Sequence, residues 1–142
     1  YTSQNSGLLL GLGVSSISDT GNAFAQNKKA LADYYTSINK GELAIQRGYF
    51  LTEEDIAFRQ YILNIACQGS TSFHTIHLPL LKKYTFPKLD QFVTDGLVEY
   101  NEQYLKLTAD GHYFIRNICS AFDLYLQRDN SIPNKPIFSK AI

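Results

Sequence analysis

The chain has 142 residues, 44% of them hydrophobic and 18% charged, a composition typical of a globular domain and not of a disordered segment. Its 13 basic and 13 acidic residues cancel, which counts against a nucleic-acid partner, because binding to nucleic acid depends on neutralising phosphates. No apolar run approaches the roughly 18–20 residues of a membrane span, so we expect a cytoplasmic protein with no membrane partner.

The first predicted element lies in GLLLGLGVSSIS, residues 7–18. Its apolar residues, interrupted by glycine, are typical of a buried strand that leads into a loop. Apolar residues then recur at helical spacing from Asn27, and Gly41 stands where a helix usually ends, so we predict a helix between them. GELAIQRGYF, residues 41–50, is predicted to be a connector because it contains two glycines.

The sequence LTEEDIAFRQYILNIAC predicts a second helix. Thr52 suits its N-cap, and the acidic residues that follow favour the positive end of the helix dipole. Gly69 is expected to end this helix. A short helix is predicted around residues 74–84. Another is predicted from about residue 87 to residue 95, where a proline suits the first turn and Gly96 closes the helix.

The remaining sequence predicts a small hairpin and a long last helix. In LVEYNEQYLKLT, residues 97–100 are expected to pair with residues 104–107. Thr108 or Asp110 would cap a helix that continues to about Gln127. Helix, helix and two-stranded wing is the order of a winged-helix-like unit, so the predicted fold class is mainly α (α+β). This architecture serves DNA binding, protein docking and plain structure, and it does not decide the function.

The glycine stretch matches no nucleotide-binding motif. Gly11 and Gly13 form GxG, but Ser16 stands where the fingerprint needs a third glycine, and no GK[ST] occurs. Read alone, the stretch favours a buried strand entering a tight turn over a ligand loop. Cys67 and Cys119 fall within apolar helical patterns and are predicted to be reduced core residues. Without a CxxxCxC motif the chain cannot hold an iron–sulfur cluster by itself.

Polar residues in apolar surroundings are the other candidates for a site. His74 and His77 could share a helix face, as metal ligands do, but no third ligand is close in sequence, and no metal site is predicted. Arg116 lies among apolar positions of the last predicted helix. Such a side chain extends to solvent, pairs with an acid such as Asp123, or binds an anionic ligand. Arg47, on the predicted connector, is a similar case.

Several segments, in order along nearly the whole chain, resemble the C-terminal part of the oxygen-independent coproporphyrinogen III oxidases, which are radical S-adenosylmethionine enzymes of haem biosynthesis. GVSSIS followed by AQN, and RNIC followed by AFDLYL, carry the most specific resemblance. YTSQ, LTEED, DGLVEYNE, LKLTADG and FSKAI continue it. Because the sequence contains no methionine and begins at Tyr1, we expect a cut or processed piece of a longer polypeptide.

The resemblance implies an arrangement of domains. Residues 1–26 would be the last strand segment of a partial (β/α) barrel with its loop. Residues 27–128 would form a helical C-terminal domain, which contains the winged-helix-like unit and the hairpin at about 97–107. Residues 129–142 would be an irregular tail. The rest of the radical S-adenosylmethionine barrel, with the ligands of a 4Fe–4S cluster, would lie upstream in the same polypeptide.

The resemblance also implies which residues meet ligands. Ile17 would contact S-adenosylmethionine, and Gly13 would let the backbone approach the cofactor closely. Arg116 would pair with a propionate of the substrate. No catalytic residue and no metal ligand are expected in this chain. We further expect exposed apolar surface around residues 8–12, since a barrel strand without neighbours leaves an unpaired edge.

The activity implied for the family is the oxidative decarboxylation of coproporphyrinogen III to protoporphyrinogen IX by 5′-deoxyadenosyl radical chemistry. An electron donor would be a further partner. This chain would help to cover the active site and would be inactive alone. The alternatives from other classes are a winged-helix module that binds DNA or a protein, and a structural docking domain.

Overall fold

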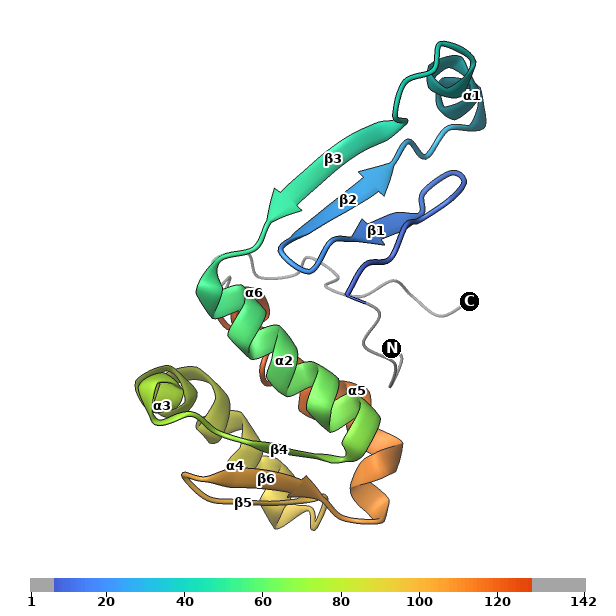
Figure 1. Cartoon of the computed structure of the whole chain (residues 1–142). Coiled ribbons are helices and arrows are strands. Elements are labelled where there is room, and N and C mark those ends of the chain that lie inside the picture. Colours follow the sequence, from blue (N-terminus) through green and yellow to red (C-terminus); the bar gives the residue numbers. More distant parts are fainter. Residues whose placement is uncertain (1–6, 129–142) are drawn as a thin grey trace. The chain divides into compact units, whose positions relative to one another are not determined.

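The computed structural model describes residues 7–128 and divides into two compact units (Figure 1). The N-terminal unit extends to Ile56, and the C-terminal unit begins at Ala57. Residues 27–56, predicted to belong to the helical domain, therefore group with the residues before them. Within residues 7–128, no helix is both long enough and apolar enough to cross a membrane.

The N-terminal unit is built on a three-stranded antiparallel sheet of order β1-β2-β3. The strands are β1 (Ile17–Asp19), β2 (Ala23–Asn27) and β3 (Ile45–Phe50), and helix α1 (Leu31–Asn39) connects the last two. The prediction of a connector over residues 41–50 is wrong, and β2 was not predicted. Both strands form because they pair with each other along most of their length, which no local pattern reveals.

Residues 7–16 do not form the buried strand that their leucines suggested. The backbone of this segment pairs with β1 only in one isolated bridge, between Leu9 and Asp19. The four leucines at positions 8, 9, 10 and 12 are exposed, Leu12 to 88%. The expected exposed apolar surface around residues 8–12 is therefore confirmed. Antiparallel pairing differs from the parallel strands of a (β/α) barrel, and the assignment of residues 1–26 to a barrel stays a prediction.

Helix α1 ends as predicted and begins later than predicted. It starts at Leu31 because Asn27 is still part of β2. At its end the Gly41 amide donates to the Ile38 carbonyl at 2.9 Å, and the Glu42 amide donates to the Ser37 carbonyl at 3.0 Å. Gly41 has φ +74°, which glycine adopts without strain, so the helix ends in a Schellman motif.

Helix α2 (Glu53–Gln68) has the predicted N-cap. The Asp55 amide donates to the Thr52 hydroxyl at 3.1 Å, and the Thr52 amide donates to the Asp55 carboxylate at 2.9 Å. This reciprocal pair is a capping box, with Asp in the place usually taken by Glu or Gln. Gly69, at φ +70°, follows the last helical residue, as predicted.

The C-terminal unit combines helices with a three-stranded antiparallel sheet of order β4-β6-β5 (Figure 1). The hairpin of β5 (Val98–Tyr100) and β6 (Tyr104–Leu107) confirms the prediction, whereas β4 (Ser70–Ser72) was not predicted. Between β4 and β5 the chain is helical in consecutive short segments: η1 (Thr75–His77), α3 (Leu78–Leu80), η2 (Leu81–Thr85) and α4 (Phe86–Thr94). Apart from β4, the order of a helix, further helices and a hairpin is the one predicted, and the classification as a winged helix stays a prediction.

The last helix is interrupted, contrary to the prediction of one long helix. It consists of η3 (Asp110–Phe114), α5 (Ile115–Ser120) and α6 (Leu124–Arg128). The break turns Phe122 fully into the core, and Asp123 caps α6 by accepting hydrogen bonds from the amides of Tyr125 and Leu126 at 3.0 and 3.3 Å. The predicted tail, 129–142, lies outside the described residues.

One hydrophobic core holds the C-terminal unit together. Its largest fully buried apolar side chains are Phe122, Ile65, Leu81, Leu89, Leu105 and Ile118. They come from α2, η2, α4, β6 and α5 and from the turn before α6, so this single cluster joins most of the elements of the unit. Cys119 belongs to the core as predicted, but Cys67 is exposed, so its predicted burial is wrong.

Candidate functional site

The most constrained backbone in the described part of the chain is a turn in the glycine loop, the name used here for residues 11–17. Gly13 has φ +93°, and Ser15, at φ +61°, is the one residue other than glycine with positive φ within residues 7–128. The Ser16 hydroxyl donates to the Gly13 carbonyl at 2.7 Å, and the Ser15 amide donates to the Lys28 carbonyl at 3.0 Å. Such a backbone conformation costs on the order of 1–3 kcal/mol and persists where its surroundings fix it, often at functional sites.

Side chains from β1, β2 and α1 fix the loop in place. The side-chain amide nitrogen of Asn27, Nδ2, lies 3.1 Å from the Gly11 carbonyl, 2.9 Å from the Gly13 carbonyl and 3.1 Å from the Ser16 hydroxyl. The Gly13 amide donates to the Tyr34 hydroxyl at 3.1 Å, and the Gly11 amide donates to the Ser18 hydroxyl at 3.1 Å. Sequence reasoning did not single out Asn27, although asparagine is uncommon within a strand.

Gly11 lies against the backbone of Ile17. A Cβ added to Gly11 would stand 2.7 Å from the Ile17 oxygen and 2.9 Å from its nitrogen, so no larger residue fits there. The Asn27 amide donates to the Ser16 carbonyl, and alternation along the strand then turns the Ile17 backbone groups away from β2 and toward Gly11. The Ile17 side chain is 51% exposed. It is therefore this side chain, more than the backbone groups, that a ligand can reach.

The structure brings two of the three predicted site residues together. Gly13 and Ile17 lie in the same loop of the N-terminal unit, and Arg116 is exposed on α5 of the C-terminal unit. Within residues 7–128, Arg116 forms no ion pair. Asp123, considered as its partner, accepts the hydrogen bonds that begin α6. Arg47, the other arginine considered, donates to the side chain of Gln26 at 2.8 Å.

The two neighbouring histidines are tied to a buried tyrosine. The phenol oxygen of Tyr61 accepts a hydrogen bond from the His74 amide at 3.1 Å and lies 2.7 Å from Nδ1 of His77. The tautomer of His77 decides which of the two groups donates in this hydrogen bond. Burial raises the pKa of Tyr61, so the phenol stays protonated. Among residues 7–128, no group of three His, Cys, Asp or Glu side chains could hold a metal ion.

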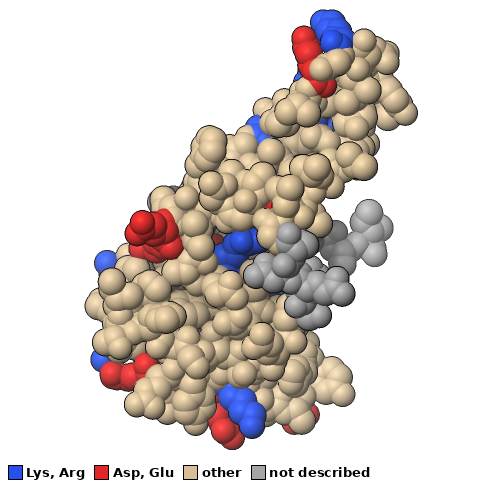
Figure 2. All heavy atoms as spheres, in the orientation of Figure 1, with Lys and Arg blue, Asp and Glu red and all other residues tan. Residues whose placement is uncertain are grey.

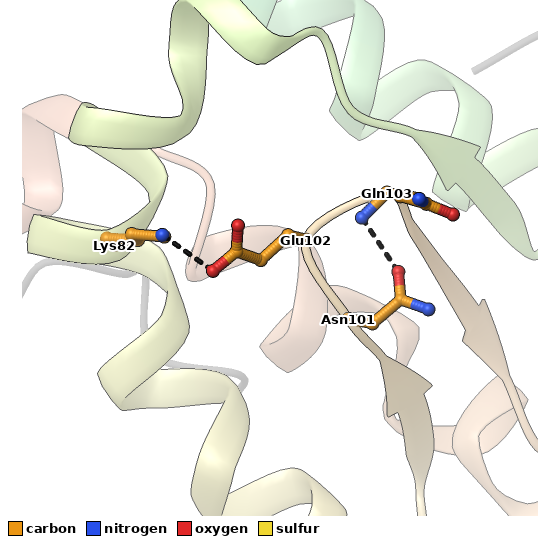
Figure 3. A network of polar contacts seen from close by, with 4 residues as sticks. All are labelled: Lys82, Asn101, Glu102 and Gln103. Atoms are coloured by element: carbon orange, nitrogen blue, oxygen red, sulfur yellow. Dashed lines mark hydrogen bonds and ion pairs between the residues drawn. The ribbon is translucent and has the colours of Figure 1, made fainter.

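An exposed polar cluster fixes the tip of the β5–β6 hairpin (Figure 3). The Lys82 ammonium lies 2.6 Å from the Glu102 carboxylate, and both side chains are more than half exposed. The Asn101 side-chain oxygen accepts hydrogen bonds from the amides of Gln103 and Tyr104, at 2.7 and 3.0 Å. These contacts orient η2 and the turn, and they form no pocket.

Other surface features do not coincide with the predicted site. A hollow of about 610 Å³ on the C-terminal unit is lined by Phe92, Asp95, Leu97, Asp110, Tyr113 and Phe114, none of which was a predicted site residue. Figure 2 shows basic and acidic side chains scattered in small groups on the face drawn. That face therefore presents no continuous basic surface of the kind that binds nucleic acid.

Comparison with known proteins relates the chain to one enzyme family. No protein-family model matches it. It is 36% identical to the oxygen-independent coproporphyrinogen III oxidase of Escherichia coli over 138 residues, which cover 90% of this chain and 29% of that protein. The corresponding protein of Pseudomonas aeruginosa is 34% identical over 89% of this chain and 29% of its own length. The solved structure of coproporphyrinogen III oxidase (HemN) from Escherichia coli, described as a radical SAM enzyme, matches with a TM-score of 0.73 at 37% identity, over 88% of this chain and 30% of that chain.

The chain is homologous to part of the oxygen-independent coproporphyrinogen III oxidases. This relationship confirms the resemblance that the sequence motifs indicated. The chain spans less than a third of the length of the Escherichia coli and Pseudomonas aeruginosa relatives.

The description of the solved relative as a radical SAM enzyme implies S-adenosylmethionine and a 4Fe–4S cluster. The residues of this chain do not fit the cluster, since the sequence holds only two cysteines and no CxxxCxC motif. The glycine loop fits the adenosyl group of S-adenosylmethionine. The loop carries no charged side chain, and it contains a half-exposed isoleucine at 17 and an exposed leucine at 12.

Proposed function

We propose that this chain is the C-terminal part of an oxygen-independent coproporphyrinogen III oxidase and that it covers the active site of that enzyme. The observation that carries the proposal is the match to relatives over about nine-tenths of this chain but less than a third of their length. The reaction of the whole enzyme is the oxidative decarboxylation of coproporphyrinogen III to protoporphyrinogen IX in haem biosynthesis. The whole enzyme acts in the cytoplasm and takes electrons from a separate donor.

In this proposal the N-terminal unit completes the cofactor site. S-adenosylmethionine, when bound at its cluster, supplies the radical chemistry that the side chains of this chain cannot perform. Ile17 packs on the adenosyl group, and Gly13 gives the backbone the turn that brings the loop to the cofactor. The exposure of Ile17 and the uncharged character of the glycine loop support this role.

The exposed apolar surface of the N-terminal unit supports an upstream barrel in the same polypeptide. The leucines from position 8 to position 12 and all six residues of β3 are exposed in this chain. Burying one leucine side chain contributes about 1.5–3 kcal/mol, so such a surface is stable when another part of the protein covers it. In this proposal the barrel that carries the cluster ligands accounts for the length that the relatives have beyond the matched region.

Arg116 supplies the positive charge for a substrate carboxylate. The guanidinium is exposed on α5, and its planar fork suits a propionate. A variant Arg116→Ala of the full-length enzyme is expected to raise KM for coproporphyrinogen III, with kcat less affected. An unchanged KM would remove Arg116 from the substrate site.

The whole proposal is tested by activity of the complete polypeptide. Full-length protein with its cluster reconstituted, a reductant and S-adenosylmethionine under anaerobic conditions is expected to convert coproporphyrinogen III to protoporphyrinogen IX, as measured by chromatography of the oxidised porphyrins. This chain alone is expected to form no product. If the full-length protein also forms none, while this chain retards random duplex DNA at low salt, the alternative of a winged-helix DNA-binding module is favoured.

A further inference from the structure

The side-chain amide of Asn27 is the centre of the hydrogen bonds that hold the glycine loop. Its nitrogen reaches three oxygen acceptors at 2.9–3.1 Å, two of them backbone carbonyls that flank the loop residue Leu12. The third is the Ser16 hydroxyl, which itself donates to the Gly13 carbonyl. These acceptors lie 11–16 residues earlier in the sequence. One side chain therefore holds the loop through contacts that are distant in sequence.

The sheet is built in a way that directs Asn27 toward the loop. β2 pairs regularly with β3 up to Gln26, which faces Arg47, and the register then shifts so that Asn27 faces Ile45. A bulge of this kind re-aims a side chain, and bulges are frequent beside active sites. The extra residue at this shift, Gln46, belongs to β3. β3 therefore contributes to the orientation of Asn27.

The loop that Asn27 holds is under backbone strain. Ser15 has φ +61°, in the region that favours glycine, and Gly13 has φ +93°. Gln26 donates to the Ser15 carbonyl at 3.1 Å, and the hydroxyl of Tyr34 accepts from the Gly13 amide. A conformation that is unfavourable by itself and fixed by several long-range bonds is the arrangement expected of a preorganised site.

We propose that Asn27 is a positioning residue for the binding of S-adenosylmethionine, and this inference rests on the proposed contact between Ile17 and the cofactor. Asn27 holds the turn at residues 13–16, and the turn determines how β1 presents Ile17. Asn27 itself does not touch the cofactor. Tyr34 supports the same turn from α1 through a single hydrogen bond.

The chemistry of the side chain makes the role specific. All three partners of Asn27 are oxygen atoms, and the two hydrogens of the amide nitrogen are shared among them. An aspartate has the same shape but replaces the nitrogen with a negatively charged oxygen that repels the two carbonyls and cannot donate. The substitution Asn27→Asp therefore keeps the volume and removes the function. Asn39→Asp makes the same change at the exposed last residue of α1 and is the matched control.

The test uses the full-length polypeptide and measures the dissociation constant for S-adenosylmethionine by equilibrium dialysis. Asn27→Asp is expected to weaken binding by about tenfold or more, because several part-buried acceptors lose their donor, whereas Asn39→Asp binds as the parent does. In hydrogen–deuterium exchange, the peptide that contains residues 11–18 is expected to exchange faster in Asn27→Asp alone. At saturating S-adenosylmethionine, the variant is expected to keep most of the parent kcat while its KM for the cofactor rises.

Two further variants separate the possible outcomes. If Ile17→Ala weakens binding and Asn27→Asp leaves both binding and exchange unchanged, the positioning role is overturned while the proposed cofactor contact stands. If neither variant changes binding, the cofactor contact itself is wrong. If Asn27→Asp does not fold, as judged by circular dichroism, Tyr34→Phe decides: weaker binding supports the proposal, and unchanged binding with unchanged exchange overturns it.

Discussion

The two units of this chain reach their structures by different means. The C-terminal unit has a closed hydrophobic core, in which Phe122, Ile65 and their neighbours are fully buried. Among the described residues of the N-terminal unit, only Ser37 and Ala44 are buried, and hydrogen bonds around Asn27 define its most specific feature. The C-terminal unit thus has a core of its own, whereas the N-terminal unit presents an exposed apolar surface and a loop that, in the proposed function, another part of the enzyme covers.

The difference in packing between the two units is tested most directly by removing one large side chain from each unit. Phe122→Ala leaves a cavity in the middle of the core, and we expect a loss of about 3–5 kcal/mol in the free energy of unfolding. Phe50→Ala, at the end of β3, removes a side chain that is 83% exposed, and we expect a change within about 0.5 kcal/mol. Urea unfolding followed by circular dichroism measures both. A loss of several kcal/mol in Phe50→Ala would mean that β3 is already covered within this chain.

The features that the sequence could predict are those that depend on residues close together in the chain. Thr52, Gly41 and Gly96 were predicted as caps or stops because a cap depends on residues a few positions away. The β5–β6 hairpin was predicted for the same reason. Strands β2, β3 and β4 escaped prediction because each is defined by pairing with a distant segment. The last helix was predicted as continuous because the break at Asp123 depends on burying Phe122 in a core that local sequence does not reveal.

In the candidate site, too, contacts between residues distant in sequence could not be predicted. Gly13 and Ile17 were predicted from a resemblance of motifs, and the structure places them in one loop. Asn27 was present in the AQN motif, but its role depends on three acceptors far away in sequence and on a bulge between two strands, neither of which was predicted. A residue that acts through long-range hydrogen bonds leaves no periodic pattern along the chain.

A second prediction uses pH to probe the C-terminal core. Burial and, to a smaller extent, the charge interaction with Cys67 raise the pKa of Cys119 from 9.0 to about 11. The folded protein therefore holds the thiol proton more tightly than the unfolded chain does. The contribution of this thiol to the free energy of unfolding is present below about pH 9 and is lost as the pH rises toward 11, by about 2–3 kcal/mol at most.

The measurement is urea unfolding as a function of pH for the parent, for Cys119→Ala and for Cys67→Ala. Cys119→Ala is expected to remove the part of the alkaline loss that this thiol causes between about pH 9 and 11, while the raised pKa values of Tyr61 and Tyr100 leave a further loss at higher pH. Cys67→Ala, at an exposed position, is expected to leave most of the loss and to shift it slightly to lower pH, because the smaller of the two causes that raise the pKa of Cys119 is gone. An alkaline loss that persists unchanged in Cys119→Ala would show that another group causes it.

A third prediction concerns the start of α2, the helix that begins at the end of the N-terminal unit. Thr52→Ala removes the hydroxyl that accepts from the Asp55 amide, and we expect a loss of about 1 kcal/mol in the free energy of unfolding. Thr36→Ala is the control. The Thr36 hydroxyl donates to the Ala32 carbonyl within α1, so its removal is expected to be neutral or slightly stabilising. Equal losses in the two variants would contradict a capping role for Thr52.

The smallest expected effect belongs to the ion pair at the hairpin tip. Lys82 and Glu102 approach to 2.6 Å, but both are more than half exposed, so solvent and salt screen their attraction. Lys82→Met is expected to lower the free energy of unfolding by about 0.2–1 kcal/mol at low salt and by less at 1 M salt, relative to Lys88→Met at an exposed position of α4. A loss above about 2 kcal/mol, or one that salt does not reduce, would mean that the stability of the C-terminal unit depends on its surface contacts as well as on its core.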